Sequence, residues 1–197
     1  MRPQTSFGAF RMARTVQDDA REKQIADHLG LRRTSGRAGP DAHDECGNPF
    51  ELKSATKTGV TTARDVGLHT IAEWRQKYWI VAAGENLESG FRFDAIYIAH
   101  PDDLEPRFRE IEQRLQGDWA HCQSVLKAAR DAHVSEESIK KVEYICSRGI
   151  TLNNPKIPLS LFVLNATQLE HSNPRSARFQ LADFVRRRPL RPRASTA

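Results

Sequence analysis

The residues of this chain best suited to chemistry are two acids and a lysine: Asp41, Glu51 and Lys53. They occur in the order Asp, then Glu-x-Lys, a set that can hold a divalent metal ion beside a phosphodiester. Carboxylate oxygens suit Mg²⁺ or Mn²⁺, ions that keep part of their shell as water. The pattern therefore indicates metal-assisted chemistry on a phosphate ester.

A folded-back pair of strands is expected to position these side chains. Residues 50–54 have the composition of a short strand, in which residues i and i+2 point to the same face. Glu51 and Lys53 then project together while Leu52 points into the core. Asp41 precedes this strand across a loop rich in Gly, Pro and Asn, as expected for a hairpin.

The remaining pattern predicts an α/β fold with a mixed central sheet flanked by helices. A helix is expected to start at Thr15 and to end before Gly30. Short apolar or alternating runs predict strands, and three-to-four spacing predicts helices. The further strands are expected at 79–83, 91–99 and 159–164, and the further helices at 66–78, from 101 to about 116, at 119–132 and at 136–147.

The composition favours an anionic partner. Thirty Lys and Arg against 25 Asp and Glu give the 197 residues a net charge of +5. Three widely spaced cysteines fit neither a disulfide framework nor a zinc site, so reduced thiols are expected. No stretch has the apolar length needed to cross a bilayer, and no membrane partner is expected. These features predict an intracellular protein.

Around the acid–lysine set the chain resembles the PvuII-like type II restriction endonucleases of the PD-(D/E)xK nuclease superfamily. The likeness extends well beyond the three chemical residues and covers roughly residues 17 to 164. The residues that carry it are Gly36-Arg37, Gly39, Asp41-Ala42, Asp44, Gly47, Glu51 to Ser54, Arg75-Gln76, Trp79-Ile80, Asp94 to Tyr97, Pro101, Asp103 to Glu105 and Asn153 to Pro158.

The resemblance implies a restriction-endonuclease-like fold and a homodimer that cuts both strands of a palindromic duplex, leaving 5′-phosphates. It assigns Asp41 and Glu51 as metal ligands and Lys53 as the catalytic lysine, and the Leu52 carbonyl is a further expected ligand. Mg²⁺ is the expected cofactor, with Mn²⁺ as a substitute. The implied setting is a prokaryotic cytoplasm, with a cognate DNA methyltransferase as partner. The resemblance gives Trp74 a supporting role near the scissile phosphate and Asp18 one in the minor groove. A position in the core is the alternative for Trp74, and a helix-start residue is the alternative for Asp18.

Two segments are expected to read the DNA sequence. Arg64 can donate to guanine and Asp65 can accept from cytosine; a solvated ion pair on a loop is the alternative. Asn153 and Asn154 resemble a pair that reads adenine, and ordinary turn chemistry is the alternative for them. Thr61 and Thr62 are expected to add contacts to phosphate or base.

The chain is expected to form one nuclease domain over residues 15–172. Residues 1–14 are expected to be a flexible arm and residues 173–197 a basic, flexible tail. Residues 117–150 look like a helical insertion, either a hairpin packed on the core or second subunit or a helix-turn-helix mimic. Ala38 replaces an acid of the family pattern, which weakens the expected metal site.

A Mg²⁺-dependent restriction endonuclease is the predicted function. A structure-selective repair nuclease or nickase would keep the same fold and metal. A non-catalytic DNA-binding module is the alternative from another class, and the intact acids and lysine argue against it.

Overall fold

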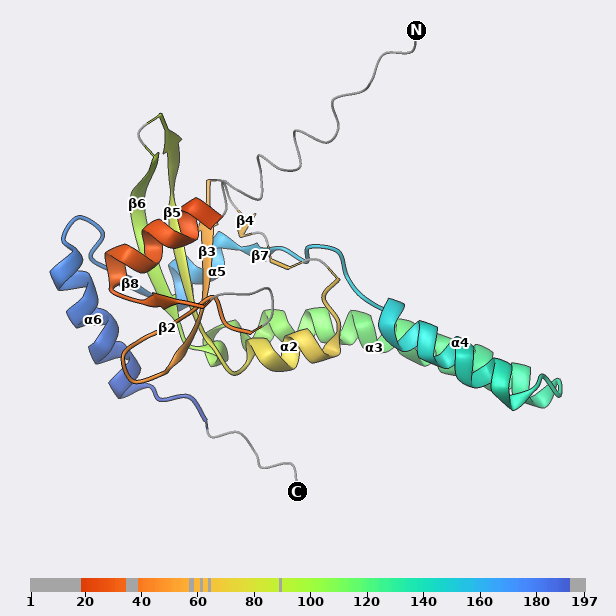
Figure 1. The fold of residues 1–197 in the computed structure, drawn as a ribbon. Coiled ribbons are helices and arrows are strands. Elements are labelled where there is room, and N and C mark those ends of the chain that lie inside the picture. The colour runs from red at the N-terminus through yellow and green to blue at the C-terminus, as the bar shows by residue number, and fades with distance from the viewer. Residues whose placement is uncertain are drawn as a thin grey trace, which may run out of the picture.

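A mixed β-sheet forms the centre of the molecule (Figure 1). The computed structural model describes residues 19–34, 39–56, 59–60, 62–63, 65–88 and 90–191. Within these residues the strands of the sheet lie in the order β1-β2-β3-β5-β6-β8; β3 and β5 are parallel and the other neighbours antiparallel. The strands are β1 (Arg32–Arg33), β2 (Ala42–His43), β3 (Pro49–Ala55), β5 (Tyr78–Leu87), β6 (Gly90–Ala99) and β8 (Thr167–Leu169). The predicted fold class is confirmed.

Helices cover both faces of this sheet. One face packs against residues 19–29, which are helical, and against α6 (Pro174–Arg187). The other face packs against α2 (Leu68–Trp74), α3 (Pro101–Asp131) and α5 (Leu159–Asn165). Side chains along β5 point alternately to the two faces of the sheet. Tyr78 and Ile80 therefore enter the first core, on the side of α6, while Trp79 and Val81 enter the second core, on the side of α3. Within the described residues, no helix combines the length and apolar character required to span a bilayer.

The expectation of a flexible tail from residue 173 is wrong over residues 174–187. These residues form α6, which begins at the Asn173 N-cap; its Oδ1 accepts from the Arg175 and Ser176 amides. The apolar residues of α6 recur every three to four positions despite the surrounding arginines, and they are buried: Ala177, Leu181, Phe184 and Val185. Beyond the helix, Arg188 donates two hydrogen bonds to Asp103. The last residues, 192–197, lie outside the described part.

Residues 159–164 form a helix, α5, and the strand expected there is wrong. A short apolar run fits either element when only its composition is considered. In α5 the Phe162 side chain is buried while Leu164 is 78% exposed, because only one side of the helix meets the core. The nearby strand is β7 (Ile157–Pro158), which ends where α5 begins.

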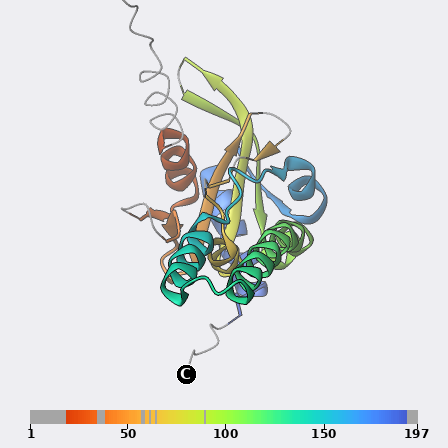
Figure 2. The same ribbon diagram turned by 90° about the vertical axis from the view of Figure 1, so that its right-hand side faces the viewer.

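The expected insertion is a helical hairpin that extends away from the sheet (Figures 1 and 2). It consists of the distal part of α3 and of α4 (Glu136–Gly149). The sequence predicts a break near Gly117 between two helices, but α3 continues unbroken through this residue to Asp131. Leu126 and Ile139 are buried where the two helices pack against each other. Within the described residues, the hairpin therefore packs mainly on itself and not on the core. Packing on a second subunit stays a prediction.

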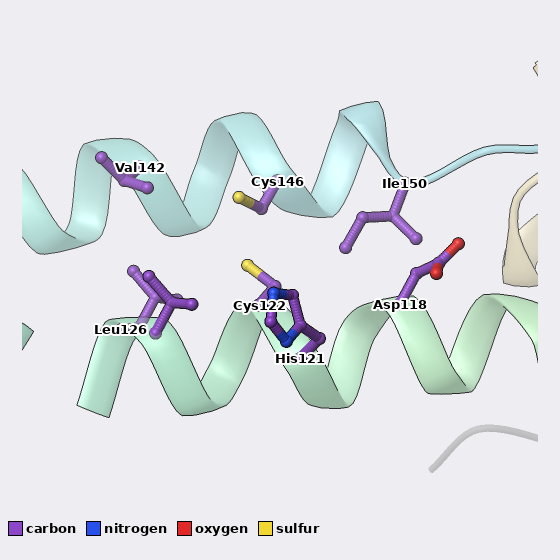
Figure 3. Close-up of a pocket in the computed structure, with 8 residues that line it drawn as sticks. Asp118, His121, Cys122, Leu126, Val142, Cys146 and Ile150 are labelled. Carbon is purple, nitrogen blue, oxygen red and sulfur yellow. The ribbon is translucent and has the colours of Figure 1, made fainter. Parts of the chain in front are cut away.

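A small hollow lies between the two helices of the hairpin (Figure 3). Its volume is about 280 Å³ and its lining is mainly apolar. The thiols of Cys122 and Cys146 face each other across it (Figure 3). A hydrogen bond with Cys146 raises the pKa of the Cys122 thiol to about 11. The raised pKa favours the protonated form of the Cys122 thiol at neutral pH.

Candidate active site

The hairpin of β2 and β3 sets the position of Asp41. The two strands pair antiparallel, and the Asp41 amide donates to the Phe50 carbonyl at 2.9 Å. The turn between them is closed by Asp44, whose side chain accepts from the Asn48 amide and side chain, and by Gly47 at φ +86°. The predicted hairpin is confirmed.

The three predicted chemical residues meet at one point. The Lys53 Nζ lies 3.0 Å from Asp41 Oδ2 and 2.8 Å from Glu51 Oε1. It also donates to the Leu52 carbonyl at 2.9 Å. The Leu52 amide donates to Asp41 Oδ2 at 2.8 Å and so fixes the Asp41 carboxylate against β3. We call Asp41 Oδ2, Glu51 Oε1 and the Leu52 carbonyl oxygen the oxygen cage.

Each buried charged group of this site keeps its charge because of its charged neighbours. Burial alone would raise the pKa of Glu51, but Lys53 and Lys77 together lower it. Burial likewise opposes the charge of Lys53, while Glu51, Asp41 and Glu22 raise its pKa. Glu51 is therefore held as a carboxylate and Lys53 as an ammonium.

Two charged residues of the site were not predicted from the sequence. The Lys77 Nζ lies 3.2 Å from Glu51 Oε2 and 3.0 Å from the Gly39 carbonyl. Glu22, on the helix at 19–29, lies 3.8 Å from the Lys53 Nζ. Burial raises the pKa of Glu22 to about 7, against the opposing effect of Lys53. No local sequence pattern identifies either residue, because each reaches the site through tertiary packing.

The oxygen cage already surrounds a positive charge, the Lys53 ammonium, which acts as a stand-in for a cation. Three oxygens at 2.8–3.0 Å from one nitrogen are a donor set that suits a hard cation such as Mg²⁺. In the part of the chain that the structure describes, no three His, Cys, Asp or Glu side chains gather closely enough to hold a metal ion. The oxygen cage needs only two acidic side chains, because its third oxygen is a backbone carbonyl. These residues therefore fit a divalent metal.

A second, two-stranded ribbon brings together the segments expected to read DNA. Strand β4 (Gly59–Val60) pairs antiparallel with β7, and Val66 forms a bridge with Leu152 through two backbone hydrogen bonds. Asp65 and Asn153 flank this bridge and are exposed. Residues separated by almost ninety positions in the chain thus lie next to each other, at the base of the hairpin of α3 and α4.

Two of the expected reading residues have structural roles in this ribbon. Thr62 is buried and its hydroxyl donates to the Pro155 carbonyl at 2.8 Å, so this side chain holds the ribbon together; its contact with DNA stays a prediction. Asn154 adopts φ +49°, a conformation that Asn tolerates in turns. The nitrogen of its side-chain amide lies 3.2 Å from the carbonyl oxygens of Thr62 and Ala63. The turn alternative therefore describes Asn154. The predicted roles of Thr61, Arg64 and Asp18 concern residues outside the described part of the chain.

Trp74 lies in the second core, the alternative position that the sequence offers for it; a contact with a phosphate stays a prediction. Its ring is 2% exposed and packs edge-on against Trp79 and beside Phe108 in the second core. Its carbonyl accepts from the Trp79 indole. Trp74 therefore holds α2 against the sheet.

The comparison with known families agrees with this geometry. The family model of restriction endonuclease PvuII matches residues 8–125, which is more than half of the chain. The chain belongs to this family. It is accordingly a type II restriction endonuclease, a site-specific deoxyribonuclease that binds DNA and uses a divalent metal cofactor. The matched residues include the whole β2–β3 hairpin, the oxygen cage and Lys77, whereas Asn153 and α4 lie beyond them.

Proposed function

We propose that this restriction endonuclease cuts both strands of a short palindromic DNA site in a Mg²⁺-dependent reaction and leaves 5′-phosphate ends. The observation that carries the proposal is the convergence of Asp41, Glu51 and the Leu52 carbonyl on one positive charge. These three groups would hold the ion. Mn²⁺ has similar ligand preferences and would substitute for Mg²⁺.

The chemistry of the site follows from its charges. A divalent cation bound there would neutralise phosphate charge and lower the pKa of a bound water. Lys53, as an ammonium, can donate to a phosphate oxygen and offset the negative charge that develops there. Asp41 is held by the Leu52 amide, and Glu51 by Lys77, so both carboxylates are fixed before DNA arrives. Such preorganisation reduces the reorganisation that the reaction requires.

Sequence recognition is proposed to centre on Asp65 and Asn153. Both are exposed on the ribbon of β4 and β7, and their neighbours Thr62 and Asn154 stiffen it. An Asp can accept from cytosine N4, and an Asn can pair with adenine N6 and N7. Together with Arg64, they favour a half-site that contains one G·C and one A·T pair.

The proposed active form is a homodimer. A palindromic site presents the same sequence on both strands, so two identical subunits related by a two-fold axis can each cut one strand. The cell that makes such an enzyme must protect its own sites, and a cognate DNA methyltransferase is the proposed partner for that protection.

Digestion of a mapped plasmid with and without Mg²⁺, followed by sequencing of the termini, tests the function. We expect both strands to be cut at one defined sequence, with 5′-phosphates, only when the ion is present. Lys53→Ala should abolish cutting and retain DNA binding in a gel-shift assay. Cutting at junctions regardless of sequence, or nicking of one strand, would instead indicate a repair nuclease or nickase.

A further inference from the structure

The Lys53 ammonium contacts all three atoms of the oxygen cage. These are the atoms that the proposed metal would bind, so this inference rests on the proposed function. Two cations a few ångströms apart repel each other strongly in a buried site. A divalent ion can therefore enter the cage only if the Lys53 Nζ moves to another acceptor.

Glu22 is placed to be that acceptor. Its Oε1 lies 3.8 Å from the Lys53 Nζ. Among the described residues, Lys53 forms ion pairs with Asp41, Glu51 and Glu22, and of these three only Glu22 is not part of the oxygen cage. A lysine has a flexible four-carbon stem and three rotatable donors, so a small rotation can close this distance to a hydrogen bond. The Glu22 side chain is 19% exposed, and weak solvation strengthens the attraction.

The helix that carries Glu22 is fixed in place. Ile25 and Leu29 of the same helix are buried in the first core, together with Phe50 and Leu52 of β3. Glu22 therefore keeps a defined distance from β3, the strand that carries Lys53. The glutamate can direct the lysine to one position because neither element has to move.

We propose that Glu22 receives the Lys53 ammonium when a divalent ion takes its place in the oxygen cage, and thereby positions the lysine for the reaction. Glu22 acts through Lys53 and is a positioning residue. The displaced ammonium would stay next to the cage, where it could donate to a phosphate oxygen of bound DNA.

A purely structural role for Glu22 would be to hold Arg33, whose Nη2 lies 3.6 Å from Glu22 Oε2. Asp19 offers a matched control, because its Oδ1 lies 3.7 Å from the same Arg33 atom on the same helix. Asp19 makes no described contact with Lys53 and its side chain is 65% exposed. Asp19→Asn therefore removes an Arg33 partner without removing a contact with Lys53.

Calorimetric titration of the full chain with Ca²⁺ and with Mg²⁺ at pH 8, without DNA, tests the proposal. At this pH the Glu22 carboxyl, whose pKa is about 7, is charged. Glu22→Gln should weaken binding of either ion about tenfold, because the displaced ammonium loses a charged acceptor. Lys53→Met should tighten binding, since it removes the competing cation. In the Lys53→Met background, Glu22→Gln should change the affinity less than about threefold, the residual effect of one nearby charge. Asp19→Asn should match the wild type.

The outcomes separate this inference from the proposed function. A wild-type chain that binds neither ion would overturn the metal site, and the inference with it. Ion binding that Glu22→Gln leaves unchanged would overturn the inference alone. An equal loss of affinity with and without Lys53 would also overturn it, because Glu22 would then act on the metal directly.

Discussion

Lys77 and Glu51 form a buried ion pair on the side of the carboxylate opposite Lys53: Lys77 lies 3.2 Å from Oε2 and Lys53 lies 2.8 Å from Oε1. Two lysines thus lower the pKa of one carboxyl that burial alone would raise. Lys77→Met should leave Glu51 paired with Lys53 alone and reduce stability at pH 7 by about 1–3 kcal/mol, the cost of a buried carboxylate oxygen without its hydrogen-bond partner. Urea unfolding measures this loss.

The pH dependence of the Lys77→Met effect checks its cause. The lowered pKa of Glu51 contributes stability above the unfolded value of 4.5, and this contribution is lost as pH falls through the folded value. The destabilisation should therefore be smaller at pH 4 than at pH 7. Lys156→Met, at an exposed lysine, should change stability little at either pH. An equal loss at both pH values would mean that Lys77 acts through packing.

Glu22→Gln should stabilise the protein at pH 8. Burial raises the pKa of Glu22 from 4.5 to about 7; Lys53 and Arg33 oppose this, while Asp41 and Asp19 add to it. Ionisation is thus disfavoured in the folded state, and stability decreases as pH rises from 4.5 through 7. Because Gln removes this cost, the melting temperature of the variant should exceed that of the wild type at pH 8.

The same comparison at lower pH tests the sign of the Glu22 effect. Below pH 4.5 the carboxyl is protonated in both states, so the advantage of Glu22→Gln should disappear there. Thermal scans at pH 4, 6 and 8 provide the measurement. A variant that is less stable than the wild type at pH 8 would show that the pairs with Lys53 and Arg33 outweigh the cost of burial.

The residues of the candidate site that are close in sequence could be predicted to lie together, whereas those that reach it from distant elements could not. The alternation of Glu51, Leu52 and Lys53 sets which side chains share a face, and the Gly- and Asn-rich turn brings Asp41 alongside. Both signals act within about a dozen residues. Glu22 and Lys77 reach the same carboxylates from a helix and from the start of another strand, and only packing determines those distances.

The errors in the fold prediction have a similar origin. The Asn173-Pro174 pair is a helix start, but the arginines around the apolar positions of α6 suggested a tail. The apolar run of α5 suggested a strand because periodicity cannot separate two short elements. In both segments, the face that meets the core decides the structure, and that face depends on elements distant in sequence.

Thr62→Ala should loosen the two-stranded ribbon of β4 and β7. The change removes a buried hydrogen bond and leaves the Pro155 carbonyl without that partner, which costs about 1–3 kcal/mol. We expect lower thermal stability and a reduced preference for the cognate site over single-base variants, measured by competitive cleavage. Thr56→Ala, at an exposed threonine after β3, should change neither. If Thr62→Ala keeps the full preference for the cognate site, the ribbon does not contribute to DNA recognition.

Phe184 and Phe179 lie on the same helix, α6, and differ in burial: Phe184 is 7% exposed and Phe179 is 76% exposed. Phe184 packs edge-on against Tyr78 of the central strand β5. Phe184→Ala should therefore lower the free energy of unfolding by about 3–5 kcal/mol, through lost burial and the cavity left behind. Phe179→Ala should stay within about 0.5 kcal/mol of the wild type in the same urea titration. Similar small losses for both variants would mean that α6 contributes little to the core, and the flexible tail expected from the sequence would then describe residues 174–187 in solution.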